Sequence, residues 1–167
     1  MVKKCIRIFC MITVLLVMSV PAAMGEAAAD TYSYSERDIW CENEGQKIYG
    51  KAYIPQTGKE KLPLVIFSHE LCMTHASGDG YARELAARGI AVYAFDYRGG
   101  SEQSQSDGRT TTMSVLTEVS DLEHVLASAR QWSIVDPAQI VVLGGSQGGL
   151  VASLTAGRHA RELRGLI

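Results

Sequence analysis

The sequence predicts an α/β fold with a mostly parallel sheet that follows an N-terminal antiparallel hairpin. Nearly continuous apolar runs at residues 62–68, 90–97 and 140–143 are typical of strands buried on both faces of a sheet. Stretches with helical periodicity separate these runs, and such an alternation specifies a parallel sheet with helices on both faces. A Gly-x-Ser-x-Gly motif directly follows the last run.

The hairpin is predicted from two segments rich in aromatic and β-branched residues, 32–40 and 47–54. Asn43-Glu44-Gly45 between them is a turn signal. A polar loop over residues 56–61 then leads into the first buried strand. The hairpin therefore precedes the parallel part of the sheet.

Helices are predicted between the buried strands. Residues 81–88 have helical spacing and end at Gly89, a natural helix stop. The elbow helix is expected over residues 147–156, Asp136-Pro137 ends the unit before it, and residues 163–167 begin a further strand. The clearest helix has its apolar residues at steps of four and three on one face and its acidic residues on the surface: Val115, Val119, Leu122, Leu126 and Ala129, against Glu118, Asp121 and Glu123.

The stretch from 141 to 150 is a short apolar run that ends in Gly-x-Ser-x-Gly, the pattern of a strand-turn-helix elbow with a nucleophilic serine. Ser146 at the tip of so tight a turn has strained backbone angles, so Gly144 and Gly148 must lack bulk. The amide of Gln147 then points toward the place where an oxyanion would form. A phosphate loop and a plain tight turn are the alternatives, although the lysine and hydroxyl pair of a P-loop is missing.

Composition and charge narrow the function. The 167 residues suffice for one domain, and 47% hydrophobic with 20% charged residues is an ordinary globular composition. The net charge of -2 does not favour a nucleic-acid partner. A disulfide between Cys41 and Cys72 and an unpaired buried thiol are both compatible with the spacing.

A metal site is not expected, and neither is a cofactor. The cysteines have no metal-binding spacing. His69-Glu70 resembles the start of His-Glu-x-x-His, but the fifth position is Met73. His75 lies six positions after His69, which would place it about 240° around any helix.

The N-terminus has the three parts of a secretory signal peptide. Basic residues come first, an apolar run over residues 8–20 follows, and small residues complete the segment at 21–25. This run is shorter than the roughly 20 residues that span a bilayer, so an uncleaved anchor is the lesser alternative. We expect a secreted or extracytoplasmic protein that meets the membrane only through this signal.

Cleavage after either Gly25 or Ala29 fits, because each cut has an alanine at the third position before it. We therefore expect two regions, a signal peptide over residues 1–29 and a domain over residues 30–167.

Three motifs together resemble the α/β-hydrolase superfamily, and most of all its serine esterases of the cinnamoyl-esterase and serine-aminopeptidase type. They are Gly144-Gly145-Ser146-Gln147-Gly148-Gly149, His69 directly after a buried strand, and Asp96-Tyr97-Arg98-Gly99-Gly100 after the next strand. The similarity runs from about residue 47 to 167. It implies the spatial strand order first, second, fourth, third, fifth, sixth.

The resemblance also assigns the reacting groups. Ser146 matches the nucleophile, and the amides of Gln147 and Leu71 match the two donors of the oxyanion hole. The family usually has glycine after the histidine of this loop, where the chain has Glu70. A bulky charged residue there would either tilt the loop or place a carboxylate near the oxyanion.

Three further residues match supporting positions of the family. His69 is expected to buttress the oxyanion loop by hydrogen bonding. Asp96 and Arg98 are expected to form an ion pair that fixes a loop at the same edge of the sheet.

The triad order in this fold is Ser, then Asp or Glu, then His, and only 21 positions follow Ser146. None of the four histidines, at positions 69, 75, 124 and 159, is expected to be the general base. We therefore expect the N-terminal portion of an α/β-hydrolase domain, truncated after the elbow helix, with the acid and base of the triad missing from this chain.

The implied function is hydrolysis of a carboxylic ester, or of an amide, through an acyl-enzyme on Ser146. A small-molecule ester or a short peptide-like molecule would be the substrate. The alternative is a non-catalytic exported protein that keeps the α/β-hydrolase fold.

Export can be tested by fusing residues 1–30 to a reporter. We expect the reporter to cross the membrane, because a basic start, a short apolar run and small residues direct secretion. N-terminal sequencing of the released protein should begin near Glu26 or Asp30. A full-length product held in the membrane would show an anchor instead.

Overall fold

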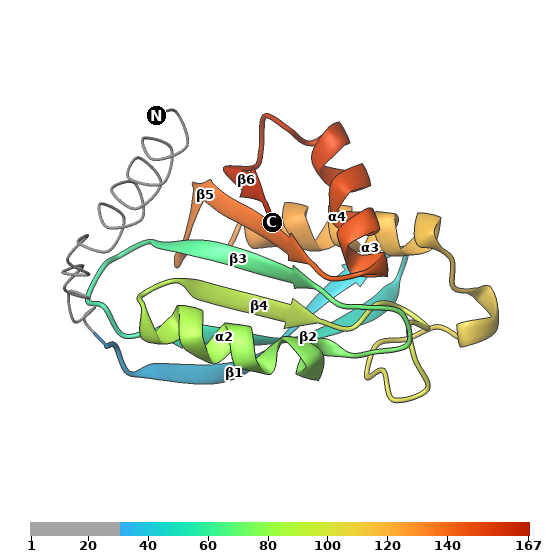
Figure 1. Cartoon of the computed structure of the whole chain (residues 1–167), viewed down its shortest axis with the longest axis horizontal. Helices are drawn as coiled ribbons and strands as arrows, with labels where there is room; N and C mark the ends of the chain where they lie inside the picture. The colour runs from blue at the N-terminus through green and yellow to red at the C-terminus, as the bar shows by residue number, and fades with distance from the viewer. Residues whose placement is uncertain (1–30) are drawn as a thin grey trace, which may run out of the picture.

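One six-stranded sheet forms the centre of the computed structural model, which describes residues 31–167 (Figure 1). The strands lie in the order β1-β2-β4-β3-β5-β6, which is the order that the resemblance implies. The strand bounds are Tyr34–Asn43 (β1), Gln46–Pro55 (β2), Leu62–Ser68 (β3), Ala91–Phe95 (β4), Val135–Gly144 (β5) and Gly165–Leu166 (β6). β2 pairs antiparallel with β1 and β4, and the remaining pairs are parallel. The prediction of an α/β-hydrolase fold with an N-terminal hairpin is thus confirmed.

The signal peptide predicted over residues 1–29 lies outside the described residues. Among residues 31–167, no helix has the length and apolar character needed to cross a bilayer.

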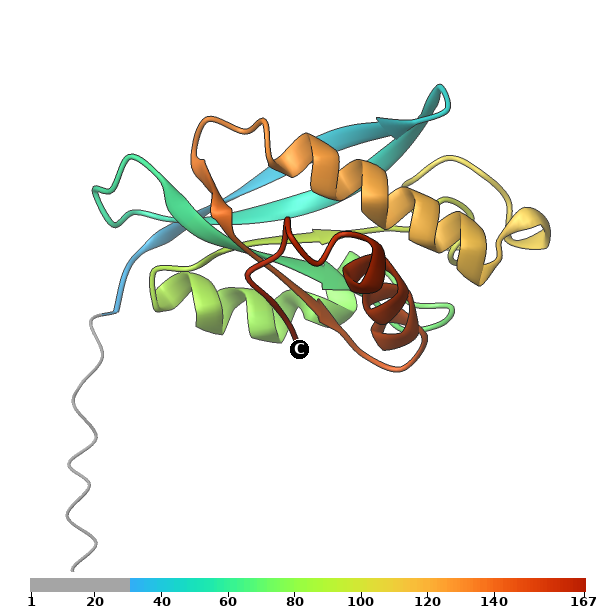
Figure 2. The ribbon, with the colours of Figure 1, turned by 90° about the horizontal axis from the view of Figure 1, so that it is seen from above.

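Helices cover both faces of the sheet. α2 (Asp79–Ala87) packs on one face, and α3 (Val115–Ala129) and α4 (Gln147–Arg158) pack on the other. Figure 2 shows α2 and α3 on opposite sides of the strands. Two short 3₁₀ turns, η1 (His75–Gly78) and η2 (Thr110–Thr112), lie in the loops.

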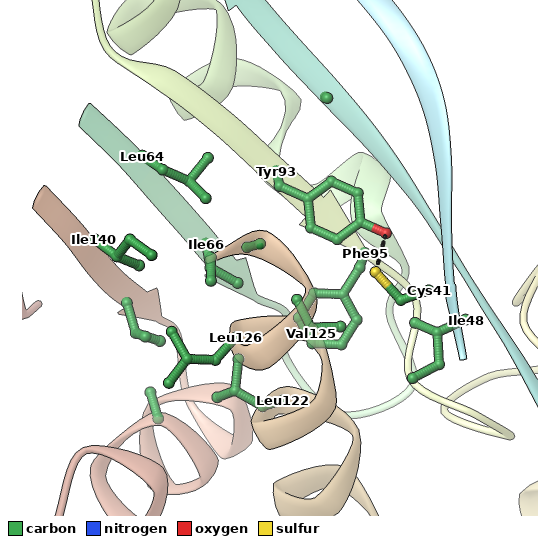
Figure 3. Close-up of a cluster of buried hydrophobic side chains, with 14 of the residues drawn as sticks. Cys41, Ile48, Leu64, Ile66, Tyr93, Phe95, Leu122, Val125, Leu126 and Ile140 are labelled. Atoms are coloured by element: carbon green, nitrogen blue, oxygen red, sulfur yellow. Dashed lines mark hydrogen bonds between the residues drawn. The ribbon is translucent and has the colours of Figure 1, made fainter. Parts of the chain in front are cut away.

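The core follows the two-residue alternation of the strands. On β3, Leu64 and Ile66 face α3 and α4, whereas Val65 faces α2. Leu122 and Leu126 of α3 point toward the same sheet face as Leu64 and Ile66 (Figure 3). The apolar stripe predicted for α3 is therefore the side that the sheet buries.

The last two strands differ in their bounds from the pattern-based prediction. β5 begins at Val135 rather than at residue 140, because Val135 pairs with Leu62 before a register shift between Leu62 and Leu64. Asp136-Pro137 lies in this irregular start, where a sheet tolerates proline. The last strand spans only Gly165–Leu166 instead of residues 163–167.

The start of α3 is fixed by a capping box. The Ser114 hydroxyl accepts a hydrogen bond from the Thr117 amide, and the Thr117 hydroxyl accepts one from the Ser114 amide. The prediction that Glu118 and Asp121 lie on the surface is wrong: they are 1% and 0% exposed. Both remain buried because polar partners from other elements reach them.

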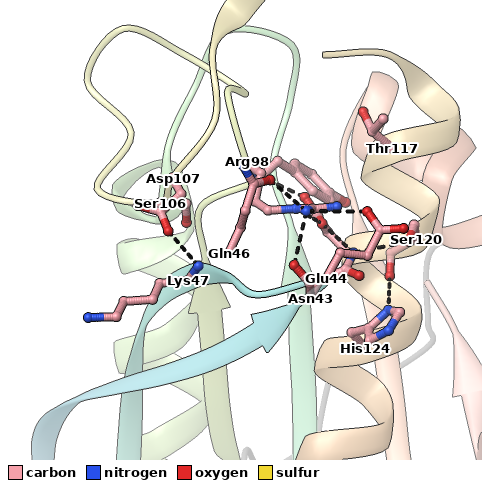
Figure 4. A network of polar contacts seen from close by, with 12 residues as sticks. Asn43, Glu44, Gln46, Lys47, Arg98, Ser106, Asp107, Thr117, Ser120 and His124 are labelled. Carbon is pink, nitrogen blue, oxygen red and sulfur yellow. Dashed lines mark hydrogen bonds and ion pairs between the residues drawn. The ribbon is translucent and has the colours of Figure 1, made fainter. Parts of the chain in front are cut away.

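Arg98 is the partner that reaches Asp121. Figure 4 shows Arg98 beside Asn43 and Gln46 of the hairpin turn. The Arg98 Nε lies 2.6 Å from Asp121 Oδ1, and its backbone amide lies 2.9 Å from Oδ2. Its Nη1 also donates to the carbonyl of Asn43 and to Gln46 Oε1, in the hairpin turn. Arg98 thus ties α3, the loop after β4 and the hairpin together.

The expected ion pair between Asp96 and Arg98 is not formed among the described residues. The guanidinium points toward α3, where Asp121 is buried and needs a cation. Asp96 instead takes its donors from two neighbouring loops, through His75 and Gln105.

Cys41 and Cys72 do not form a disulfide. Cys41 is buried, with its Sγ 3.7 Å from the Tyr93 hydroxyl (Figure 3). Cys72 is exposed. Of the two readings that the spacing allows, the unpaired buried thiol is the one found for Cys41.

The Arg98–Asp121 pair predicts a strong effect of Asp121→Ala. The change leaves the Arg98 charge buried without its carboxylate, so we expect the free energy of unfolding to fall by about 3–5 kcal/mol. Urea denaturation measures it. The exposed Glu102 provides the control: Glu102→Ala should change this free energy by less than about 0.5 kcal/mol. Equal effects of the two changes would contradict the role given to the pair.

Candidate active site

Ser146 stands between the end of β5 and the first residue of α4. Its backbone has φ 50° and ψ -120°, an unusual conformation for a residue with a side chain. Such a conformation costs about 1–3 kcal/mol and persists only where the surroundings enforce it. Its side chain is exposed. The structure therefore has the strained, solvent-facing serine that the elbow motif predicts.

Two glycines enforce this turn. A Cβ on Gly148 would lie 2.1 Å from the Ser68 carbonyl oxygen and 2.5 Å from that of His69. A Cβ on Gly144 would lie 2.5 Å from the Gly148 carbonyl oxygen. These neighbours are backbone atoms, so a side chain at either glycine would force β3, β5 and α4 apart.

The predicted oxyanion loop lies beside the elbow because β3 and β5 are paired strands. Ser68 is opposite Gly144 in the register, and the Gly145 amide approaches the Ser68 carbonyl at 3.4 Å. Among residues 31–167, neither the Leu71 amide nor the Gln147 amide makes a hydrogen bond. The amide of Leu71, in the loop after β3, and the amide of Gln147, at the start of α4, therefore both lie beyond the C-terminal ends of β3 and β5 without a hydrogen-bond partner among these residues.

The turn that carries Leu71 is tight. The Met73 amide donates to the Glu70 carbonyl at 3.1 Å, and Cys72 takes a φ of 59° inside this turn. Leu71 itself is half exposed at the tip of this turn.

His69 is buried beneath this loop at 2% exposure. Its Nδ1 donates to the Glu70 carbonyl at 2.7 Å, and its Nε2 accepts from the Tyr97 amide at 3.3 Å. Burial lowers the pKa of His69, which keeps the ring neutral. With both nitrogens occupied, His69 holds the loop and has no nitrogen left to act as a base.

Two hydrogen bonds of the Ser68 hydroxyl link the end of β3 to α4 and to Tyr97. The Ser68 hydroxyl donates to the Gly148 carbonyl at 2.8 Å, so its oxygen must accept the proton of the Tyr97 hydroxyl. Burial raises the pKa of Tyr97, which therefore stays a donor. These hydrogen bonds were not predicted from the sequence, although a serine that closes an apolar strand was a visible signal.

Asp96 joins two loops at the end of β4. Its Oδ1 accepts from both the amide and the Nδ1 of His75, at 2.7 and 2.8 Å, and its Oδ2 accepts from the Gln105 amide at 2.8 Å. Burial alone would raise the pKa of Asp96, but these hydrogen bonds outweigh it and hold that pKa below its usual range. The loop after β3 and the loop after β4 are thus anchored to one carboxylate.

Glu118 contacts Gln147, the residue that follows Ser146. Gln147 Nε2 donates to Glu118 Oε2 at 2.7 Å. Burial, together with the nearby charge of Asp121, raises the pKa of Glu118. Glu118 was predicted to lie on the surface, and its hydrogen bond with Gln147 is one reason why it is buried instead.

Within residues 31–167, no histidine makes a hydrogen bond to Ser146. His124 Nδ1 donates to the Ser120 carbonyl at 2.8 Å, and His159 lies beside Glu123 and Glu162. The described residues contain no group of three or more side chains that could hold a metal ion.

Comparison with known proteins gives one family. The model of the family described as serine aminopeptidase, S33, matches residues 59–167. No curated protein is similar enough in sequence to match the chain.

Solved structures share the fold at low sequence identity. Est1E from Butyrivibrio proteoclasticus with ferulic acid bound is 23% identical, with a TM-score of 0.68 over 77% of this chain and 50% of that one. The dienelactone hydrolase from Anabaena variabilis is 18% identical, with a TM-score of 0.63 over 80% of this chain and 62% of that one. A thioesterase domain from the curacin biosynthetic pathway is 20% identical, with a TM-score of 0.65 over 79% of this chain and 43% of that one. The chain spans about half the length of these proteins.

The elbow packing predicts opposite effects for two glycines of α4. Gly148→Ala pushes a methyl group into the backbone of β3, so we expect a loss of several kcal/mol in the free energy of unfolding. Gly157→Ala meets nothing within 4 Å and should stabilise the helix by up to about 1 kcal/mol. Urea denaturation compares them, and a stable Gly148→Ala variant would contradict the close packing.

Proposed function

The chain belongs to the serine aminopeptidase family S33 of the α/β-hydrolases, and on that premise we propose that Ser146 is the nucleophile of a serine hydrolase. Its hydroxyl oxygen would attack the carbonyl carbon of a carboxylic ester or amide. The alcohol or amine would leave, an acyl-enzyme would remain on Ser146, and water would release the acid.

The main support for this proposal is the positive φ of the Ser146 backbone. A residue with a side chain keeps φ at 50° only when packing enforces it, and here Gly144 and Gly148 lack side chains where the turn meets β3. Ser146 is exposed to solvent at the end of the sheet, between β5 and α4. This is the placement that the nucleophile of an α/β-hydrolase requires.

The amides of Leu71 and Gln147 supply the second requirement. A tetrahedral intermediate places a negative charge on the former carbonyl oxygen, and fixed backbone donors stabilise that charge. Neither amide is used by another group within residues 31–167. The tight turn at Cys72 and the start of α4 hold them in place.

A serine hydroxyl also needs a base that takes its proton. His69 is neutral with both nitrogens occupied, and the other histidines of the described chain have partners elsewhere. We therefore place the acid and the base of the triad outside residues 31–167.

We propose a small-molecule ester or a short peptide-like molecule as the substrate, and export as the route to its location. Similarity to Est1E, which was solved with ferulic acid bound, supports a small-molecule ester, and a short peptide-like molecule is equally consistent with the family. The basic and apolar N-terminal pattern supports export by a signal peptide.

The second candidate is a non-catalytic exported protein that retains the fold. One observation favours it: Glu70 places a side chain where related enzymes usually have glycine. Labelling of the nucleophile separates the two candidates.

A fluorophosphonate probe tests the nucleophile in the protein expressed from its native gene. We expect labelling at Ser146 and its loss in Ser146→Ala, because the probe reacts only with an activated hydroxyl. Ser153, exposed on the same helix, is the matched control, and Ser153→Ala should keep full labelling. Residues 1–167 alone should show little labelling, because the proposed base is absent from them.

Labelling that survives Ser146→Ala would refute the assignment of the nucleophile. A folded native protein that takes up no probe would favour the non-catalytic candidate.

A further inference from the structure

We propose that Glu70 is a specificity-determining residue that makes the Ser146 site prefer substrates carrying a positive charge. The inference rests on the proposed function, because it concerns the substrates of that site. It depends on where the Glu70 carboxylate lies, on what holds it and on the absence of a neighbouring cation.

The carboxylate occupies the space of a missing side chain next to the nucleophile. A Cβ on Gly145 would lie 2.7 Å from Glu70 Oε1, 3.2 Å from its Cδ and 3.4 Å from its Cγ. Gly145 directly precedes Ser146. The charged carboxylate of Glu70 therefore occupies the space that a side chain at position 145, directly before Ser146, would fill.

Ser77 holds the carboxylate in this place. Its hydroxyl lies 2.9 Å from Glu70 Oε2 and 3.1 Å from the Thr74 carbonyl oxygen, which share its one proton, and its amide donates to the same carbonyl at 3.0 Å. The Glu70 carbonyl in turn accepts from the Met73 amide and from His69 Nδ1. Both the backbone and the side chain of Glu70 are thus fixed by the loop.

No cation among residues 31–167 is paired with the Glu70 carboxylate. Its Oε1 makes no hydrogen bond within these residues. The ring of His69, which lies beside it, is neutral because burial lowers the pKa of His69. Glu70 is only half buried, so a bound molecule can reach it.

A fixed negative charge at this position changes which substrates react best. It opposes the negative charge that develops on the substrate oxygen, and it opposes an anionic substrate further. A substrate with its own positive charge offsets both effects. Catalytic efficiency should therefore fall in the order cationic, neutral, anionic.

Hydrolysis of matched thioesters by the protein from its native gene tests this order. Acetylthiocholine and 3,3-dimethylbutyl thioacetate have nearly the same shape and differ by one positive charge, and S-acetyl-3-mercaptopropanoate adds an anion. We expect kcat/KM to favour the cationic over the neutral thioester by roughly tenfold. Glu70→Gln keeps an acceptor for Ser77 and should bring the ratio close to one.

Glu60→Gln is the charge-matched control. Glu60 is exposed just before the start of β3, at the opposite end of the strand from the elbow, so its removal should leave the tenfold ratio intact. A ratio that is the same in the native protein and in Glu70→Gln would overturn the inference, while fluorophosphonate labelling would still support the proposed function.

Binding provides a readout that needs no turnover. Tetramethylammonium, with uncharged tert-butanol as the comparison, is titrated while the amide resonances of Gly145 and Ser146 are followed by NMR. We expect tetramethylammonium to shift them in the native protein and not in Glu70→Gln. This result supports the inference even if Ser146 takes up no probe, and an equal response in both proteins refutes it.

Discussion

The strained conformation of Ser146 depends on one backbone contact, between the first turn of α4 and the end of β3. Gly148 lies so close to the carbonyls of Ser68 and His69 that even a methyl group would collide with them. The Ser68 hydroxyl closes the same contact from the other side, by donating to the Gly148 carbonyl. Because this contact leaves no room, the chain between β5 and α4 must turn sharply, and Ser146 takes the strain.

Buried carboxylates hold the loops around this contact in place through hydrogen bonds and an ion pair. Asp96 holds the loops after β3 and β4, Asp121 holds Arg98, and Glu118 holds the side chain of Gln147. A buried charge is costly unless it is hydrogen-bonded or paired, so each carboxylate fixes its donors firmly. The loops that surround Ser146 are therefore attached to the ends of buried strands and to α3, which are the rigid parts of the fold.

The features of the fold that local sequence patterns encode could be predicted from the sequence. Apolar runs and helical spacing gave the order of the elements, and the family resemblance gave the strand order that the structure confirms. The elbow was visible because its glycines and serine are neighbours in sequence.

The partners of the polar residues could not be predicted in this way. Arg98 lies two residues from Asp96 but pairs with Asp121, 23 positions away. Glu118 and Gln147 are 29 positions apart. Such choices depend on which buried group lacks a partner once the helices have packed, and no local pattern encodes that. One clue was present: Glu118 and Asp121 directly adjoin the apolar residues Val119 and Leu122 on α3.

The closure of the elbow also has a place in the order of folding. β1 and β2 meet through a short turn, so this hairpin needs only local contacts. The hydrogen bond from Ser68 to Gly148 joins residues 80 positions apart, and it requires β5 to lie beside β3. Contacts so distant in sequence form slowly, because a long loop must close first. Ser146 therefore acquires its strained conformation only once β5 lies beside β3, which is a later step than the closure of the local hairpin.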